Sequence, residues 1–281
     1  AEGMVAKLPV QGAETNTATA MTFGLDPAFT EWSPFHGALY AVVEAAAKMV
    51  ALGGRADKIR LTFQEYFESL GKDPEKWGKP FAALIGALWA QHELEIPAIG
   101  GKDSMSGTFE DIHVPPTLAA FAVDVMQADH AVSPEFKYPD NKVYLVPARK
   151  DEQDLPKFAQ MRKNWARISA MTAEKKVFAA QSVGAGGIAA AVTKMCLGNG
   201  VGFKFTSFVA QNDLFTPDYG SIILEVSAST DVEKLLAGTG YYELGVTTAG
   251  PSIVCGSAVI MLADAEEAYT TPLEKIFPTQ V

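Results

Sequence analysis

Cysteine is scarce in this 281-residue sequence, which contains only Cys196 and Cys255. Their separation matches neither a disulfide framework nor a zinc-ligand pattern, so we expect two core thiols in a protein of the reducing cytoplasm. Long apolar runs are also missing. None approaches the ~18 residues of a membrane span, and the N-terminal residues lack the plan of a signal peptide. The sequence therefore predicts a soluble protein without a membrane partner.

Positive charge is in deficit. Lys and Arg total 23 against 33 Asp and Glu, which gives a formal net charge of −10. This sign argues against nucleic acid as a partner, and any phosphate must be held locally by backbone amides, a lysine or a metal ion. The sequence is 48% hydrophobic, which is enough apolar material for two domains of roughly 100 to 150 residues each.

Residues 99–106, with the sequence Ile-Gly-Gly-Lys-Asp-Ser-Met-Ser, carry the most concentrated polar chemistry in the chain. Two adjacent glycines let a backbone approach a ligand closely, and a cation, a carboxylate and a hydroxyl follow at Lys102, Asp103 and Ser104. This composition is typical of an anion-binding loop. The spacing alone fits equally well with an ordinary strand-to-turn connection that bears a solvated Lys-Asp pair.

The pattern over residues 34–52 predicts a helix, because apolar residues recur there at steps of three and four and Gly53-Gly54 follows. Glu44 and Lys48 lie four residues apart on it, so their charged ends can meet on one face. On spacing alone, this pair is an ordinary surface ion pair worth ~0.3 to 0.5 kcal/mol.

Three further elements are predicted in the first half: a strand over residues 58–67, a helix over 79–94 and a strand over 117–126 that is buried on both faces. Gln64 lies near the end of the first of these strands, and we expect Glu65 in the loop after it. In the helix, four apolar residues fall near one stripe, as in an amphipathic helix. They are Phe81, Leu84, Ile85 and Leu88.

In the second half, strand-like and helix-like segments alternate, which predicts an α/β fold with a mixed sheet. The expected strands cover residues 142–146, 178–183, 201–206, 221–226, 241–248 and 252–262, with helices within 151–175 and over 188–197 and 231–237. Residues 129–141 are polar and contain two prolines, as is typical of a linker. We therefore expect an N-terminal domain over residues 1–140 and a C-terminal α/β domain over 141–281.

The strand at 178–183 leads into Gly184-Ala185-Gly186-Gly187 and then a helix. The first turn of a helix offers free N–H groups and a positive dipole end, so Gly184, Gly186 and Gly187 are candidate phosphate-binding positions. The motif is not a full dinucleotide fingerprint, and no acidic residue follows at the expected distance of ~20 residues. A dinucleotide cofactor is therefore not expected.

Three stretches together resemble phosphoribosylformylglycinamidine synthase in its long, single-chain form. They are the loop at 97–106 with Val114-Pro115-Pro116-Thr117-Leu118 behind it, the helix at 41–48 with Gly53-Gly54, and the turn at 184–189. Their order and spacing match the second of two homologous halves of the synthase region, which belongs to the superfamily of aminoimidazole-ribonucleotide synthetase. The resemblance covers essentially the whole chain.

The resemblance implies that the N-terminal domain forms half of an inter-subunit β-barrel and that a C-terminal α/β domain packs beside it. It also implies a ligase of purine biosynthesis that uses ATP and Mg²⁺ to activate an amide oxygen of formylglycinamide ribonucleotide. Ammonia from a glutaminase domain then displaces phosphate to give the amidine. The implied partners are the first synthase half and the glutaminase. The sequence begins Ala1-Glu2-Gly3 without an initiator Met, and we expect a fragment that is inactive alone.

Carried over by position, Gly101, Lys102, Asp103 and Ser104 fall where the family's loop approaches nucleotide and substrate across the interface between the halves. Gln64 falls at a polar strand end that also faces nucleotide. No catalytic residue is assigned to this half.

The resemblance also matches Glu44 to a carboxylate that holds magnesium at an auxiliary nucleotide site in some members of the family. Lys48 and Ser182 stand where the family has further oxygen ligands. We therefore expect a degenerate site, in which the Lys48 ammonium group takes the position of the metal ion.

Two alternatives stay open: a free-standing kinase or synthetase of the same superfamily that works as a homodimer, and a non-catalytic interaction module. The kinase relatives carry an acidic N-terminal metal-binding region, whereas Asp26 is the only Asp in the first 56 residues here. Because half a barrel leaves an apolar strand face exposed, we expect a homodimer through the first domain.

Overall fold

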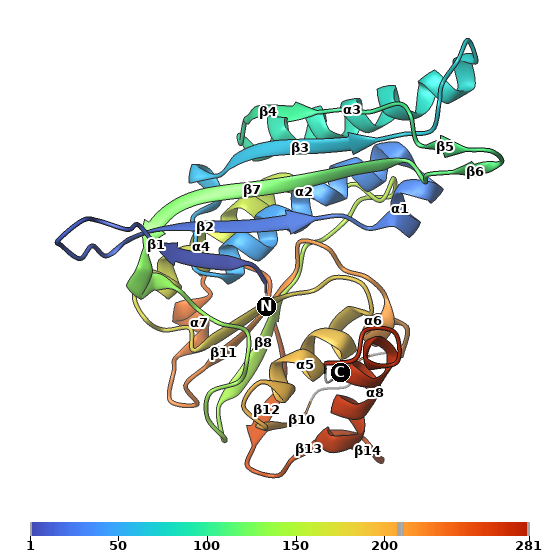
Figure 1. The fold of residues 1–281 in the computed structure, drawn as a ribbon. Coiled ribbons are helices and arrows are strands. Elements are labelled where there is room, and N and C mark those ends of the chain that lie inside the picture. Colours follow the sequence, from blue (N-terminus) through green and yellow to red (C-terminus); the bar gives the residue numbers. More distant parts are fainter. Residues whose placement is uncertain (1, 207–208, 210, 280–281) are drawn as a thin grey trace.

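The computed structural model describes residues 2–206, 209 and 211–279. Two main sheets stand one above the other, with helices between and beside them (Figure 1). The upper sheet has the order β1-β2-β7-β3-β4. Its strands are β1 (Met4–Lys7), β2 (Thr17–Gly24), β7 (Thr117–Gln127), β3 (Arg60–Tyr66) and β4 (Ala98–Lys102).

The lower sheet has seven strands in the order β14-β13-β10-β12-β8-β11-β9. They are β14 (Ala258–Met261), β13 (Ser252–Cys255), β10 (Gly202–Phe205), β12 (Tyr242–Thr248), β8 (Lys142–Val146), β11 (Ile222–Val226) and β9 (Ala179–Ser182). The pair β10–β13 is parallel and the other pairs are antiparallel. The predicted α/β fold with a mixed sheet is confirmed.

The helices connect and cover these sheets. They are α1 (Pro27–Trp32), α2 (Pro34–Ala51), α3 (Pro74–Leu94), α4 (Phe158–Ala173), α5 (Gly187–Leu197), α6 (Gln211–Phe215), α7 (Val232–Leu235) and α8 (Leu262–Glu274). Two short 3-10 turns, at Ala56–Lys58 and Ala128–His130, and a small hairpin of β5 (Thr108–Phe109) and β6 (Ile112–His113) complete the elements. No described helix is long and apolar enough to cross a membrane.

Helix α2 lies between the two sheets and is buried on nearly all sides. Ser33 caps it by accepting a hydrogen bond from the His36 amide at 3.3 Å, and Pro34 fits the first helical position, where an N–H is not needed. It contacts β2 and β7 of the upper sheet, β9 of the lower sheet, and α1, α3 and α4. A helix that is apolar all round has to be buried in this way.

Strand β7 is not buried on both faces, which corrects the prediction for residues 117–126. Ala120 and Ala122 face α2 and are buried, whereas Phe121 and Val125 on the other face are 40% and 63% exposed. The same alternation continues in β2, where Phe23 pairs with Phe121 across the strands. One face of the upper sheet is therefore uncovered, and within the described residues the sheet stays open and closes no barrel.

Helix α3 begins five residues earlier than the predicted residue 79. Asp73 caps it by accepting a hydrogen bond from the Glu75 amide at 2.9 Å, and Pro74 follows at the first helical position. Pro80 lies inside the helix, within its first two turns. The predicted apolar stripe faces solvent instead of the core: Phe81 is 66% exposed and Leu88 is 65% exposed.

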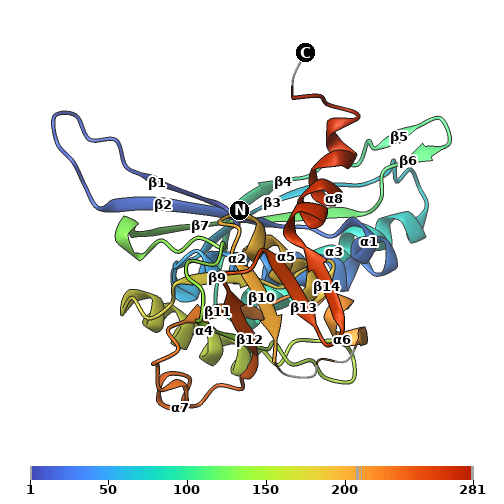
Figure 2. The same cartoon turned by 90° about the horizontal axis from the view of Figure 1, so that it is seen from below.

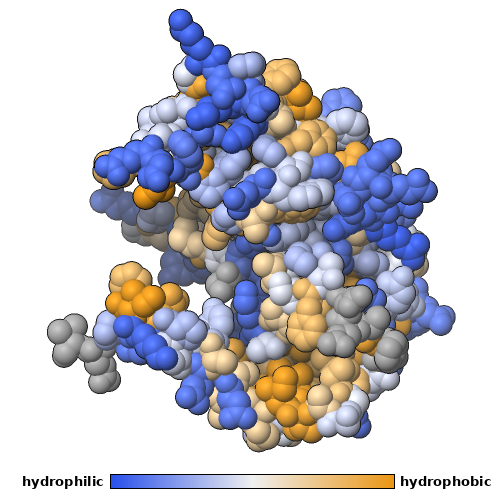
Figure 3. Space-filling model, turned by 90° about the vertical axis from the view of Figure 1, so that its right-hand side faces the viewer, coloured by the Kyte–Doolittle hydropathy of each residue, from blue (hydrophilic) through white to orange (hydrophobic). Residues whose placement is uncertain are grey.

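The segment predicted as one strand over residues 252–262 is a hairpin of β13 and β14 with a turn at Gly256. The residues after it form α8, which the sequence analysis did not predict. Figures 2 and 3 show α8 projecting from the body, with hydrophobic side chains near its tip. The domain boundary near residue 140 falls between β7 and β8 and stays a prediction.

We expect the ion pairs of Glu68 to make the stability of the fold depend on acid pH. Hydrogen bonds from Lys76 and Lys79, at the start of α3, lower the pKa of this carboxyl from 4.5 to about 2. Because the folded-state pKa is depressed, the stabilisation is complete above pH ~4.5 and is lost as the pH falls toward 2. Glu68→Gln should lower the free energy of unfolding by about 1 kcal/mol at pH 7 and flatten its decline in acid, as measured by urea denaturation.

The exposed residue Glu152 supplies the control, since Glu152→Gln should keep the wild-type profile. An equally steep acid decline in Glu68→Gln would show that these lysines do not stabilise the folded carboxylate.

Candidate functional site

The Glu44–Lys48 pair of α2 is more enclosed than a surface ion pair. The Lys48 ammonium nitrogen lies 2.8 Å from Glu44 Oε1, and the two side chains are 16% and 12% exposed. Lys48 also donates a hydrogen bond to the Phe23 carbonyl at 3.0 Å and lies 4.5 Å from the centre of the Phe23 ring. Glu44 Oε2 accepts a hydrogen bond from the Leu25 amide at 2.9 Å. Both carboxylate oxygens of Glu44 are therefore engaged within the protein.

A pocket of about 540 Å³ opens beside this pair and joins parts of the chain that are distant in sequence. Glu44, Lys48, Ser182 and Gly184 all line it, so the structure brings these predicted residues together. An added Cβ at Gly184 would lie 3.7 Å from Glu44 Oε1.

Glu2 is a further residue of this pocket, and sequence reasoning missed it. It is only 4% exposed, and its carboxylate accepts hydrogen bonds from the Gln181 side chain and, at 3.1 Å, from the Ser182 amide. Burial raises the pKa of Glu2, while the Ser182 hydrogen bonds and the charges of Lys48 and Lys194 act in the opposite direction. A single acidic residue in an aperiodic N-terminal segment carries no sequence signal for such a role.

The pocket does not fit a magnesium ion at Glu44. A hard dication needs several free oxygen ligands, and here an ammonium group occupies the Oε1 side of the only carboxylate that α2 contributes. No group of three residues suited to holding a metal ion occurs among the described residues. The charged side chains of the pocket instead offset one another. Lys48 pairs with Glu44, and the positive charges of Lys48 and Lys194 act on Glu2.

The glycine turn before α5 contributes to the pocket only in part. Gly184 lines it, whereas Gly186 and Gly187 are not among the lining residues. Both have positive φ, at 81° and 66°, a conformation that glycine adopts without strain. An added Cβ at Gly187 would lie 2.5 Å from the Leu214 carbonyl oxygen, so close packing against the segment before β11 also requires glycine there.

The stretch predicted as an anion-binding loop begins inside a strand. Gly101 and Lys102 belong to β4, which runs parallel to β3, and only Asp103 and Ser104 lie in the following loop. The register pairs Lys102 with Gln64, and the alternation of β3 places Gln64 on the uncovered face of the upper sheet. The structure thus brings Gln64 and Lys102 side by side at the ends of parallel strands.

Backbone hydrogen bonds hold the following loop against β3. The Ser104 amide donates to the Glu65 carbonyl at 3.1 Å, and the Phe67 amide donates to the Ser104 carbonyl at 2.9 Å. The Gln64 side-chain amide donates to the same Glu65 carbonyl at 3.0 Å, and Ser104 Oγ lies 2.9 Å from Ser106 Oγ. The loop is therefore ordered by its own backbone and presents the Asp103 and Ser104 side chains at its surface.

Glu65 belongs to β3, not to the predicted loop, and is only 6% exposed. Burial and, to a smaller extent, the charge of Asp103 raise its pKa. The alternation from Leu61 through Phe63 to Glu65 places it on the covered face, and this period of two is the signal that could have identified it as buried.

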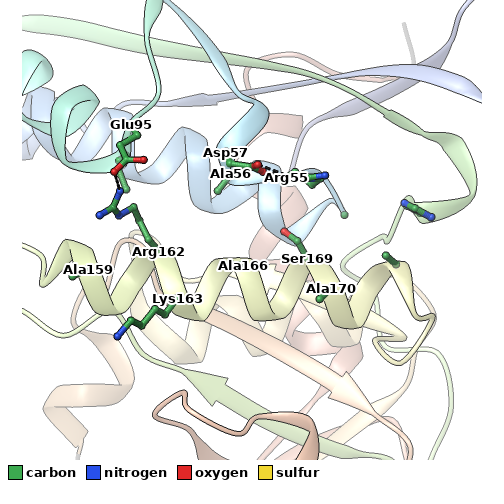
Figure 4. Close-up of a pocket in the computed structure, with 14 residues that line it drawn as sticks. Arg55, Ala56, Asp57, Glu95, Ala159, Arg162, Lys163, Ala166, Ser169 and Ala170 are labelled. Atoms are coloured by element: carbon green, nitrogen blue, oxygen red, sulfur yellow. Dashed lines mark hydrogen bonds and ion pairs between the residues drawn. The ribbon is translucent and has the colours of Figure 1, made fainter.

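Two pockets of more than 800 Å³ contain none of the predicted site residues. One, of about 850 Å³, lies between α4 and the turn after α2 (Figure 4). Its arginines are paired: Arg55 contacts Asp57, and Arg162 of α4 contacts Glu95. The other, of about 870 Å³, lies between β8, β12 and the start of α5.

No family model matches the chain. Solved structures show its fold class, the α/β fold shared by a PurL protein and a thiamine monophosphate kinase. The PurL of Thermotoga maritima complexed with FGAR matches with a TM-score of 0.74 at 12% identity, over 93% of this chain and 47% of that one. The kinase, from Aquifex aeolicus, matches with a TM-score of 0.64 at 12% identity over 92% of both chains.

Sequence comparison points to one protein within that class. The chain is 25% identical over 284 residues to the phosphoribosylformylglycinamidine synthase subunit PurL of Pyrobaculum aerophilum, covering 90% of this chain and 38% of the relative. The PurL of Campylobacter curvus is 26% identical over 255 residues, covering 83% and 35%. The predicted resemblance to phosphoribosylformylglycinamidine synthase is confirmed, and the chain spans little more than a third of the length of these relatives.

We expect the Glu44–Lys48 pair to stabilise the fold measurably. Lys48→Met keeps the length of the side chain but leaves a half-buried carboxylate without its cation, so the free energy of unfolding should fall by about 2 kcal/mol in urea denaturation. The control is Lys175→Met, which breaks the exposed pair with Asp129 and should have a much smaller effect, because solvent screens an exposed ion pair. Equal effects of the two substitutions would contradict the enclosed role of Lys48.

Proposed function

We propose that the chain forms one half of the synthase region of a phosphoribosylformylglycinamidine synthase. In that role it supplies one wall of a composite active site. The observation that carries this proposal is the placement of Gln64 and Lys102 side by side on an uncovered sheet face, in a chain similar to PurL over 90% of its length. A site completed by another half requires functional groups on such an open face.

The reaction we propose for the complete enzyme is the ATP-dependent conversion of formylglycinamide ribonucleotide and ammonia to the amidine, with release of ADP and phosphate. ATP and its analogue AMPPCP are bound by the T. maritima PurL. In this chain, Lys102 supplies a positive charge suited to a phosphate group, and Gln64 supplies an amide that can donate or accept hydrogen bonds. Asp103 and Ser104 lie in the adjoining loop, and we propose that their side chains orient the polar groups of a ligand bound on the uncovered face of the upper sheet.

The chain needs partners for this activity. We propose the homologous first synthase half, which carries the main ligands of ATP and substrate, and a glutaminase that supplies ammonia. A solved complex of T. maritima named PurLQS, whose PurL resembles this chain with a TM-score of 0.71, supports an assembly of separate parts. Magnesium enters through the first half, because the Glu44 pocket does not fit it.

We propose that the pocket at Glu44, Lys48, Ser182 and Gly184 is a degenerate auxiliary nucleotide site. The Lys48 ammonium group takes the place that a metal ion has in relatives with oxygen ligands, and the Glu2 carboxylate accepts the Ser182 amide hydrogen bond at the pocket wall. Magnesium-dependent retention of ADP by the purified chain would contradict this role.

A free-standing kinase is the second candidate, because the A. aeolicus thiamine monophosphate kinase matches over 92% of both chains. The scarcity of Asp near the N-terminus counts against a kinase, because Asp26 is the only Asp in the first 56 residues and is already engaged within the fold. Its carboxylate caps α1 by accepting the Ala28 amide hydrogen bond at 3.0 Å and accepts the Tyr219 hydroxyl hydrogen bond at 2.6 Å. An assay of phosphate transfer by the chain alone separates the two candidates, since only a kinase is active without the other half.

We expect the purified chain to form no amidine from ATP, formylglycinamide ribonucleotide and ammonium chloride, and to gain this activity when the homologous first half is added. Lys102→Ala should lower the rate of the mixture at least ~10-fold, because a phosphate contact is lost. The control is Lys204→Ala, which changes an exposed lysine of β10 on the other sheet. No activity in the mixture, or equal loss in both variants, would refute the composite site.

The uncovered face of the upper sheet should drive self-association when the other half is absent. Its exposed apolar residues include Met21, Phe23, Phe121 and Val125, and we propose a homodimer through this face. Val125→Glu should lower the mass measured by sedimentation velocity, whereas Phe109→Glu in the β5–β6 hairpin should leave it unchanged. A strictly monomeric wild-type chain at high concentration would contradict this interface.

A further inference from the structure

Helix α3 has its small residues inside and its large apolar residues outside. The side that packs toward α2 is lined by Ala83, Gly86, Ala87 and Ala90. Gly86 is required there, because an added Cβ would lie 2.0 Å from the Phe35 carbonyl oxygen. This close approach of the two helices leaves no room for the large side chains of α3 between them.

The opposite side of α3 carries six large apolar side chains, all between 40% and 66% exposed. They are Trp77, Phe81, Leu84, Ile85, Leu88 and Trp89, and we call them the α3 stripe. No Asp, Glu, Lys or Arg occurs from residue 80 to residue 91. A solvated helix face normally carries charged residues, so three turns without any charge indicate a surface that is covered in the working protein.

The stripe has the spacing of a helix-packing seam. Trp77, Phe81, Leu84 and Leu88 follow one another at steps of four, three and four, which is the repeat that lets one helix pack along another. At one end the stripe continues to the neighbouring helices, because the Trp89 ring lies 6.1 Å from the ring of Phe35 at the start of α2. The surface therefore fits a helix as its partner.

We propose that the α3 stripe binds the α3 stripe of a second copy of this chain, in an antiparallel pair related by a two-fold axis near Leu84. Such a pair is self-complementary, because the same uncharged seam lies on both sides. The nearby Lys76 and Lys79 share the single carboxylate of Glu68 within each copy, which leaves one net positive charge. In an antiparallel pair these lysines lie at opposite ends of the seam, so the residual charges of the two copies stay apart.

The area of the stripe is sufficient for such a contact. At roughly half exposure, Trp77, Phe81 and Trp89 offer about 300 Å² per copy, since an aromatic side chain buries ~150 to 250 Å² when fully covered. The three aliphatic side chains and the rim of the helix add to this, so the two copies together reach on the order of 1,000 Å², which is the smallest area expected of a specific interface. The sheet-face dimer uses other residues, so this contact does not rest on the proposed function.

The test uses the purified chain in the Val125→Glu background, where the sheet face is blocked. Sedimentation velocity should still show a dimer. Adding Leu88→Glu should weaken that dimer at least ~100-fold, because two charges would be buried at one seam. Adding Phe109→Glu instead, at another exposed apolar position, should leave the dimer intact. Circular dichroism establishes that each variant is folded.

A second readout locates the contact. With Cys255 replaced by Ser, Leu84→Cys should give a disulfide-linked dimer on mild oxidation, and Phe109→Cys should not. A folded Val125→Glu variant that stays monomeric at all concentrations, and whose Leu84→Cys form does not cross-link, would overturn the proposal. That result is expected if the stripe is covered by a different protein segment, and it would leave the composite active site untouched.

Discussion

The burial of α2 is the constraint on which the rest of the structure depends. This helix touches both sheets and three other helices, so nearly every position on it faces protein. Any charge on such a helix has to be neutralised where it stands, and Glu44 and Lys48 neutralise each other. The same pairing places an ammonium group against the Glu44 carboxylate at the wall of the pocket beside α2, so this packing requirement also fixes the charge that the pair presents to the pocket.

Covering the inner face of the upper sheet with helices leaves two apolar surfaces without partners. One is the outer face of the sheet, around Phe121 and Val125, and the other is the α3 stripe. They belong to different layers, because α3 packs on α2 on the covered side of the sheet. Exposing apolar area of this size to water costs free energy, which is the physical basis of the two associations proposed above.

The candidate site could be predicted in part from the sequence. The motif at residues 99–106 and its resemblance to the synthase identified Lys102 and Gln64, but no spacing relates two residues that lie 38 positions apart. Their adjacency depends on the parallel register of β3 and β4, two strands that are joined by a crossover through α3. Glu2 escaped prediction for the same reason, since its partners Gln181 and Ser182 lie 179 and 180 positions away in the sequence.

The sequence by itself determined the elements whose pattern is local: the helix at α2, the strands β3 and β8, the turn before α5, and the α/β class with its mixed sheet. Hydrophobic period and glycine positions carry that information within a few residues. Tertiary structure alone decided which faces were covered. The apolar stripe of α3 looks like a core face in sequence, and only the close approach at Gly86 turns it outward. Burial depends on what packs opposite a residue, and no local pattern contains that information.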